Sequence, residues 1–264
     1  MTPTELSGAW NFRDVAELTG IRPGRFFRSS ELSSLDDSGR KALSTLGITD
    51  VADLRSPGEV ERRGGDAVPD GVAVHLLPFP DLSTHTAEAP HDAGWRQMMT
   101  EHPDAVDAAG AAERFMTAEY RKFPTLSGAQ RAVRQLISLL GNDQTVITHC
   151  FAGKDRTGFA VATVLETVGV TQEVILDDFL HSNMAVPHLR ERIVDSIRTR
   201  AGETTEVITF AEARLTDAVL GVREDYLVTA RRVIDDEFGG LAGFLAAAGV
   251  TDDDVARVRT ALVG

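Results

Sequence analysis

Four short hydrophobic runs in the first 150 residues predict buried β-strands. Each run is only a few residues long, and turn-forming or charged residues surround it. The runs are RFFRS (25–29), ITDVADL (48–54), VAVHLLPF (72–79) and QTVITHC (144–150).

Between and after these runs, hydrophobic residues recur at the three- and four-residue spacing of helices. Three predicted helices end at a glycine, namely Gly47, Gly141 and Gly169. Strands that alternate with helices imply a mostly parallel sheet, so we expect an α/β fold with a central sheet of about four to five strands and helices on both faces. The helical stretches are DDSGRKALSTL (36–46), SGAQRAVRQLISLLG (127–141) and RTGFAVATVLETVG (156–169).

The C-terminal third is predicted to be helical throughout. Helix breaks are expected at Gly221 and at Gly239–Gly240. Thr251 and Asp254 form the pattern of a capping pair for the last helix. We expect one domain over residues 1–264.

Composition narrows the functional classes. The 264 residues are 42% hydrophobic and 25% charged, which is ordinary for a globular protein. The net charge of −13 opposes binding to nucleic acid or an anionic membrane, so an anionic substrate needs a local basic pocket. One cysteine excludes an internal disulfide, and no run approaches the roughly 20 hydrophobic residues of a membrane span.

The single cysteine, Cys150, ends the last hydrophobic run and precedes the turn FAGKDR and a helix predicted from about Thr157. A lone cysteine is commonly a small buried hydrophobe. Here, however, the turn offers successive backbone N–H groups and a helix N-terminus, which together bind anions. The same field favours the reactive thiolate. Arg156 returns over this cradle, where a guanidinium can hold two phosphate oxygens.

The neighbours of Cys150 fit the same chemistry. His149 can hydrogen-bond the backbone beneath the thiolate, and Gly153 permits a close backbone approach. The Thr157 hydroxyl can donate to the sulfur and ease its departure. The loop is not a Walker phosphate loop, because GxxxxGK[ST] is absent.

The stretch HCFAGKDRTG (149–158) resembles the Cys-x5-Arg signature loop of cysteine-dependent protein tyrosine phosphatases. Four earlier segments follow the order found in a bacterial branch of that family that also acts on lipids, so the resemblance covers nearly the whole chain. These segments are NFRDV (11–15), RPGRFFRSSELS (22–33), LGITDVADLRSPGEV (46–60) and VHLLPFPDL (74–82).

The resemblance implies a phosphatase that forms a cysteinyl-phosphate intermediate. Cys150 would be the nucleophile, and Arg156 would bind phosphate and stabilise the transition state. The leaving oxygen needs a proton donor. Asp81, just after the third strand, is our first candidate and Asp155, inside the loop, our second. The loop residues expected to bind phosphate are Phe151, Ala152, Gly153, Lys154, Asp155 and Arg156.

Lys154 distinguishes this loop from that of a plain tyrosine phosphatase. The AGKxRTG form is similar to loops of phosphoinositide phosphatases, which implies phosphoinositide substrates beside phosphotyrosine, phosphoserine and phosphothreonine in proteins; a solvated loop lysine is the alternative. No cofactor, nucleic acid or stable membrane insertion is expected. His85 and His91 lack metal-ligand spacing, so we expect no metal.

Other residues near the strand ends have supporting roles or two open interpretations. Arg55 could contact substrate, whereas Asp53 could anchor the loop through a buried pair. Residues expected to be structural are Asn11, Arg13 and Asp14, which match the family's NxRD pattern, and Arg28 with Ser29.

Two segments are expected to act as lids. Residues 82–110 lack a periodic pattern, which is typical of a long mobile loop. Residues 203–249 are assigned by the resemblance alone, with Phe210 through Tyr226 as the stretch expected to shield the nucleophile.

Two other functions remain open from the residues themselves, a sulfurtransferase and a phospho-binding pseudophosphatase. Arg156 and Thr157 fit phosphate chemistry better than sulfur transfer, and a pseudophosphatase should lack the cysteine or the arginine. The start of the chain lacks the pattern of a classical signal peptide, so we expect a cytoplasmic protein or one exported without such a signal.

Overall fold

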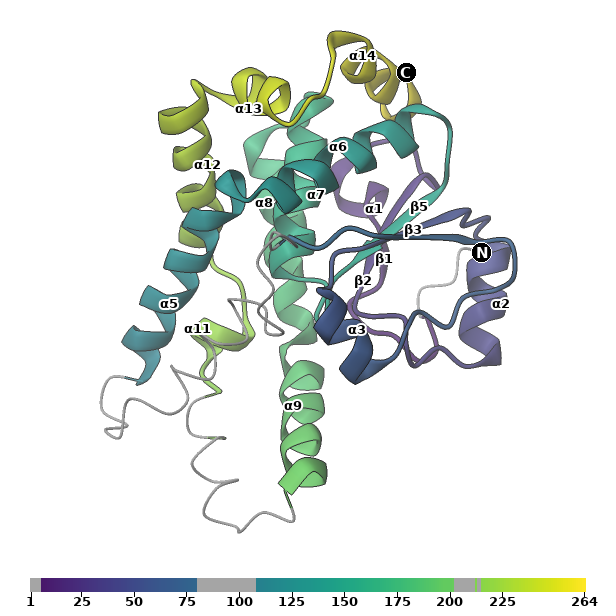
Figure 1. The fold of residues 1–264 in the computed structure, drawn as a ribbon, viewed down its shortest axis with the longest axis vertical. Coiled ribbons are helices and arrows are strands. Elements are labelled where there is room, and N and C mark those ends of the chain that lie inside the picture. Colours follow the sequence, from purple (N-terminus) through teal and green to yellow (C-terminus); the bar gives the residue numbers. More distant parts are fainter. Residues whose placement is uncertain (1–5, 80–107, 202–211, 213–214) are drawn as a thin grey trace.

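The computed structural model describes residues 6–79, 108–201, 212 and 215–264 (Figure 1). Five short strands form one sheet in the order β1-β2-β5-β3-β4. Four of them run parallel, and β1 pairs antiparallel with β2 at one edge. The predicted α/β class, with a mostly parallel sheet, is confirmed. The strands are β1 (Arg13–Asp14), β2 (Phe26–Ser29), β3 (Asp50–Asp53), β4 (Ala73–Leu76) and β5 (Val146–His149).

Alternate strand residues supply two hydrophobic cores, one on each face of the sheet. Helices α6 (Ser127–Gly141) and α7 (Asp155–Thr167) cover one face, and α2 (Asp37–Thr45) packs on the other. The prediction of helices on both faces is therefore confirmed. Phe26, Ala52 and Val146 belong to the first core, and Phe27, Val51 and Ile147 belong to the second.

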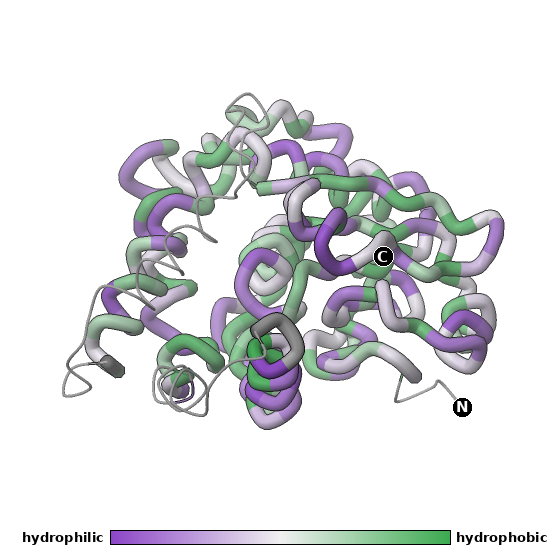
Figure 2. Tube along the Cα trace, turned by 60° about the horizontal axis from the view of Figure 1, so that its bottom comes forward, coloured by the Kyte–Doolittle hydropathy of each residue, from purple (hydrophilic) through white to green (hydrophobic). Residues whose placement is uncertain are grey.

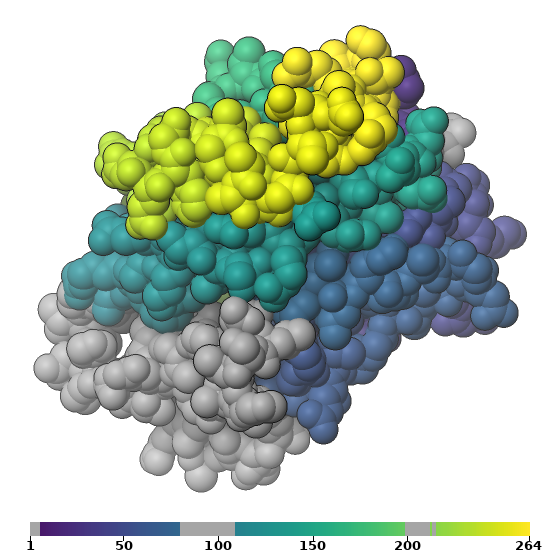
Figure 3. Space-filling model, turned by 45° about the horizontal axis from the view of Figure 1, so that its top comes forward, coloured from purple at the N-terminus to yellow at the C-terminus, as the bar shows by residue number. Residues whose placement is uncertain are grey.

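The C-terminal third is helical, as predicted, among its described residues. Helix α12 lies along α5, and α14 packs on α6, so the end of the chain covers the middle (Figure 3). In Figure 2 many helical turns change between hydrophobic and hydrophilic colours, as expected of helices with one buried face. Within the described residues, no helix combines the length and hydrophobicity needed to cross a membrane. The remaining helices of the described chain are α1 (Ala16–Thr19), α3 (Pro57–Arg63), α5 (Ala108–Lys122), α8 (Gln172–His181), α9 (Val186–Ala201), α11 (Asp217–Leu220), α12 (Glu224–Phe238), α13 (Leu241–Ala247) and α14 (Asp252–Leu262), with 3-10 turns at Phe123–Thr125 and Ser182–Ala185.

Local sequence sets several helix ends. Thr251 and Asp254 form the predicted capping box of α14, and Ser56 and Glu59 form another at the start of α3. Helix α7 differs because no side chain caps its N-terminus, which follows Lys154. Its first amides are therefore left to face the turn after β5.

Some predictions about the fold were wrong, and others concern residues outside the described chain. The third strand was expected to be buried, but β4 is an edge strand whose Val74 and Leu76 are 46% and 42% exposed. The expected loop 82–110 is helical from Ala108, where α5 begins, and residues 82–107 lie outside the described residues, as do 203–211 of the second expected lid segment.

Candidate active site

The site is built where three parallel strands end side by side. Cys150 directly follows the central strand β5, while Glu31 and Arg55 follow its neighbours β2 and β3. The backbone links these ends, because the Glu31 amide donates to the Phe151 carbonyl (3.0 Å) and the Leu54 amide donates to the His149 carbonyl (2.8 Å). Ligand sites of open α/β sheets form at such strand ends.

Gly153 shapes the turn after Cys150, as predicted. Its φ of +66° lies in the left-handed region, and a Cβ at this position would come within 2.0 Å of the Ser29 carbonyl oxygen. A side chain here would therefore strain the backbone and collide with β2. The turn can lie this close to β2 only because residue 153 is glycine.

Side chains from the N-terminal part of the chain hold the outer side of this loop. The Asn11 amide donates to the carbonyls of Ala152 (3.1 Å) and Gly153 (3.0 Å), and Arg28 also donates to the Gly153 carbonyl (2.8 Å). In a trans peptide the next N–H points away from the carbonyl, so the following amides face the opposite side. Within the described residues, the amides of Phe151, Ala152 and Gly153 donate no hydrogen bond. They are available to an anion.

A buried ion cluster supports those contacts. Asp178 in α8 accepts from Arg13 (2.8 Å) and from Arg28, while Ser182 lies within 3.2 Å of both guanidinium groups. Burial opposes ionisation of Asp178, but the two arginines outweigh it and lower the pKa of this carboxyl. The geometry agrees with the structural roles expected of Asn11, Arg13 and Arg28.

Arg156 lies in the first turn of α7 and is paired with Glu59 in α3. Nη1 and Nη2 of Arg156 each lie 2.7 Å from a Glu59 oxygen, and Nη1 also donates to the Leu54 carbonyl (3.2 Å). Burial opposes the charge on Arg156, but Glu59 outweighs it and raises the pKa of the guanidinium. Among the described residues these three contacts use three of its five N–H groups, so Nε–H and one Nη2–H remain as a fork for two oxygens.

Cys150 itself is buried, with 2% of its surface exposed. The Thr157 hydroxyl, expected to donate to the sulfur, is buried and has no hydrogen-bond partner in the described part of the chain. The turn is covered by a hydrophobic cluster in which Ala152 packs with Leu189 of α9 and with Leu215 and Leu220 at α11. This cluster lies over the loop that follows Cys150.

Lys154 and Asp155 are tied to each other and to that cover. The Lys154 ammonium lies 2.8 Å from Asp155 Oδ2 and donates to the backbone carbonyls of Val219 (2.9 Å) and Gly221 (3.1 Å). Asp155 also accepts from the Tyr120 hydroxyl (3.0 Å). Burial and the neighbouring Asp155 raise the pKa of Tyr120 well above its usual range, so this phenol remains a donor. The solvated-lysine alternative does not describe Lys154, which is buried.

Comparison with known proteins agrees with this arrangement. A family model described as the tyrosine phosphatase family matches residues 4–264. The chain belongs to the tyrosine phosphatase family. The triple specificity protein phosphatase PtpB of Mycobacterium tuberculosis is 53% identical over 276 residues and is matched over the full length of both chains. A tyrosine-protein phosphatase of Nostoc commune is 23% identical over 246 residues, which cover 92% of this chain and 76% of that protein.

These similarities confirm the predicted resemblance to protein tyrosine phosphatases and the predicted phosphatase class. They also exclude the sulfurtransferase among the alternatives, because the matched family is one of tyrosine phosphatases. The roles of individual residues remain predictions. Asp81, His85 and His91 lie outside the described residues.

The phosphatase holds Arg55 as a buried anchor. Its guanidinium binds Asp53 (Nε–Oδ1 and Nη2–Oδ2, 2.9 and 2.8 Å), Asp66 (2.9 Å) and the Gly64 carbonyl (3.2 Å). Burial opposes its charge, but Asp53 and the other carboxylates outweigh burial and raise its pKa. Of the two interpretations left open by the sequence, this geometry fits anchoring by Asp53 rather than a substrate contact by Arg55.

One group in the phosphatase could in principle hold a metal. Oxygen and nitrogen ligand atoms of Asp53, Asp66 and His149 lie within 4.8 Å of one another. However, the Arg55 guanidinium already binds both carboxylates, so a cation would meet a fixed positive charge at the same oxygens. The group does not fit a cation site.

Four supporting residues of the phosphatase were not predicted from the sequence, namely Glu59, Asp66, Tyr120 and Asp178. Each contacts a residue far away in the sequence, and no local sequence pattern indicates which residue that is. For Glu59 the SPGE capping pattern was a signal for the start of α3, but not for the pair with Arg156.

Proposed function

We propose that this phosphatase hydrolyses phosphomonoesters through a cysteinyl-phosphate intermediate on Cys150. The observation that carries the proposal is the position of Cys150 at the start of a loop with three unused amides, next to an Arg156 whose remaining fork is aimed by Glu59. A phosphate held by these amides and by Arg156 would lie within reach of the Cys150 sulfur as nucleophile. Phe151 through Arg156 form the phosphate-binding loop.

The first half-reaction transfers the phosphoryl group to sulfur. The Cys150 thiolate attacks phosphorus, an S–P bond forms, and the P–O bond to the leaving group breaks. Charge on the equatorial oxygens is stabilised by the loop amides and by the Nε–H and Nη2–H of Arg156. The leaving oxygen takes a proton from a carboxylic acid.

The second half-reaction releases phosphate. Water attacks phosphorus, the P–S bond breaks, and the carboxylate that gave up its proton accepts one from the water. The buried Thr157 hydroxyl is free to donate to the departing sulfur, since it is otherwise unpartnered among the described residues. No step requires a cofactor from outside the chain.

Asp81 is our first candidate for the acid and Asp155 the second. Asp155 accepts hydrogen bonds from Lys154 and Tyr120, so both of its oxygens contact neighbouring side chains. This arrangement supports a bracing role for Asp155 and leaves the acid role to Asp81, which follows β4 in the sequence.

We propose phosphotyrosine, phosphoserine and phosphothreonine in proteins, and phosphoinositides, as substrates. The name of the mycobacterial relative, a triple specificity protein phosphatase, supports broad specificity. Lys154 supports phosphoinositides as substrates, because its ammonium lies beside the loop. Once it is released from the carbonyls at α11, it can bind a second phosphate of the lipid headgroup. Residues 203–249 would then act as a lid, with α11 as its described inner part.

Phosphate release by the parent and the Cys150→Ser protein tests the proposal. A phosphotyrosine peptide and a phosphatidylinositol monophosphate are assayed side by side in EDTA. Release from both substrates by the parent alone supports the Cys150 mechanism and dual substrate use, whereas release by both proteins refutes the mechanism. Binding of phosphopeptide by both proteins without turnover supports the pseudophosphatase.

We also propose that the protein acts either in the cytoplasm or outside the cell. Fractionation of the producing cells, with detection of the intact chain in each fraction, distinguishes the two sites.

A further inference from the structure

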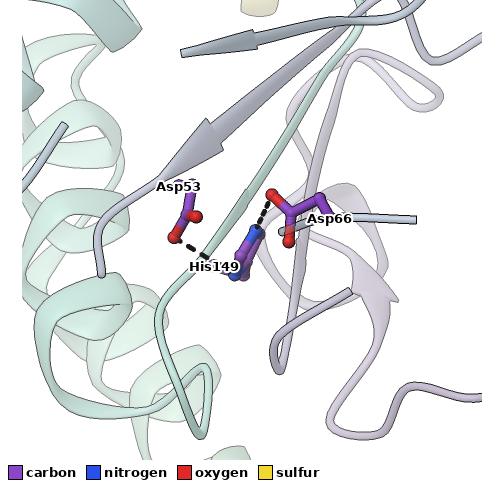
Figure 4. A group of neighbouring side chains, drawn as sticks. All are labelled: Asp53, Asp66 and His149. Carbon is purple, nitrogen blue, oxygen red and sulfur yellow. Dashed lines mark hydrogen bonds and ion pairs between the residues drawn. The ribbon is translucent and has the colours of Figure 1, made fainter. Parts of the chain in front are cut away.

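His149 is fully buried between two carboxylates directly beneath the proposed nucleophile. Its Nε2 lies 3.0 Å from Asp66 Oδ2, and its Nδ1 lies 3.0 Å from the Cys150 carbonyl oxygen and 3.8 Å from Asp53 Oδ1 (Figure 4). Asp53 comes from the end of β3, and Asp66 comes from the segment after α3. Three separate parts of the chain therefore meet at this imidazole.

With Asp66 ionised, the hydrogen-bond chemistry of these contacts requires a charged ring. The Cys150 carbonyl oxygen can only accept a hydrogen bond, and so can an ionised Asp66. A neutral imidazole carries one N–H and one lone pair, so one of its two 3.0 Å contacts would oppose a lone pair to an acceptor oxygen. Only the imidazolium donates to Asp66 and to the Cys150 carbonyl at once.

The surrounding charges agree with that assignment. Asp66 and Asp53 both contact Arg55, and Glu31 contacts Arg55 (3.4 Å) and Arg63 (2.7 Å). Three carboxylates thus face two guanidinium groups, and a protonated His149 supplies the third positive charge. Arg192 also lies 3.8 Å from Glu31, but on its solvent side, where the arginine is half-exposed.

We propose that Asp66 is a positioning residue that keeps His149 as an imidazolium, so that a fixed positive charge and a donated hydrogen bond lie beneath the Cys150 backbone. The thiolate is stabilised by this charge, and the loop is held by the hydrogen bond to the Cys150 carbonyl. The inference rests on the proposed nucleophilic role of Cys150.

The titration behaviour supports the same geometry. Burial opposes protonation of His149, but Asp66 and Asp53 outweigh burial, while Arg55 acts against them, and the pKa of the ring rises to about 9. In return, His149 and Arg55 outweigh burial at Asp66 and lower the pKa of that carboxyl. The imidazolium is therefore retained throughout the neutral pH range.

The test is the pH dependence of Cys150 alkylation by iodoacetamide in the Asp66→Asn protein. Cys150 is the only thiol in the chain, so the reaction reports on one group and needs no turnover. Asparagine keeps the shape and can donate to Nε2 of a neutral ring, so that Nδ1–H still reaches the Cys150 carbonyl and only the charge is lost. We expect the half-maximal rate to move up by about one pH unit, so that the rate falls about tenfold on the acid side with an unchanged plateau.

Asp50→Asn is the matched control. Asp50 begins strand β3, at the end away from Cys150, and pairs with His75 of β4 (2.7 Å), so its loss removes a histidine–aspartate pair without touching the loop. The Asp50→Asn midpoint should equal that of the parent. An unchanged midpoint in Asp66→Asn would overturn the proposal, because a merely structural role would lower stability without moving the pH profile.

Two measurements keep the test decisive. If Asp66→Asn does not fold, the imidazole nitrogen resonances of His149 in the parent at pH 7 decide the question, since two protonated nitrogens support the proposal and a single one refutes it. Phosphate release by the parent is measured separately. A midpoint that shifts in Asp66→Asn while the parent releases no phosphate would count against the proposed function and still support the charged state of His149.

Discussion

The two Glu59 oxygens accept hydrogen bonds from Nη1 and Nη2 of Arg156 (2.7 Å each), and the same carboxylate accepts one from the Ser56 amide (2.8 Å). The capping box that starts α3 therefore also orients Arg156, the arginine proposed to bind phosphate. A helix cap is usually a matter of local stability. Here it connects the end of β3 with the first turn of α7.

Replacing Glu59 should damage catalysis more than folding. Glu59→Gln keeps one acceptor oxygen but loses the two-pronged pair, so Arg156 can tilt out of line with the phosphate. We expect kcat/KM for a phosphotyrosine peptide to fall about 100-fold, as small misplacements of reacting groups do. Glu61→Gln, on the exposed side of the same helix, is the control and should match the parent. Equal activity of both variants would show that Arg156 does not need Glu59.

The proton donor can be identified from the leaving group. Asp81→Asn should slow a phosphotyrosine peptide by about 100-fold but an activated aryl phosphate by less than about tenfold, because a stable leaving group needs little protonation. Asp155→Asn should slow both substrates equally if Asp155 braces Lys154 and the loop. The reverse pattern would transfer the acid role to Asp155. Initial rates over a series of aryl phosphates provide the measurement.

Lys154 can be tested as a lipid-specificity residue. Lys154→Met removes the ammonium that would meet a second phosphate, so kcat/KM for a phosphatidylinositol bisphosphate should fall about tenfold, the loss of one charge-assisted hydrogen bond, while the phosphopeptide changes little. Lys122→Met, at an exposed lysine paired with Glu119, is the control. An equal fall for lipid and peptide would mean that Lys154 serves only to hold α11.

Stability should depend on pH through His149. The folded-state pKa of about 9 lies above the ordinary value of 6.5, so the stabilisation is fully present below pH 6.5 and is lost as the pH rises through about 9. We expect the free energy of unfolding to fall by roughly 2–3 kcal/mol between these pH values, measured by urea titration. In Asp66→Asn the fall should be much smaller. A parent whose stability is flat across this window would contradict the charged-ring assignment.

The sequence predicted the parts of this protein whose signals are local. Short hydrophobic runs marked the strands, glycines marked helix ends, and the order of Cys150, Gly153 and Arg156 marked the anion-binding turn. The burial expected for β4 was wrong, because the position of a strand at a sheet edge depends on topology and not on its own residues. The ion pairs of Asp66 and Asp178 could not be predicted, since each joins segments far apart along the chain.

The contacts of Asn11 have a consequence for the order in which the protein becomes active. Its partners, Ala152 and Gly153, follow it by 141 and 142 positions, and Arg28 reaches Asp178 across 150. Asn11 and Arg28 must therefore wait for α8 to be synthesised before the turn after Cys150 has all of these contacts. Such long loop closure is slow and comes late in folding. The turn after β5 is therefore braced only when segments from both halves of the chain have come together.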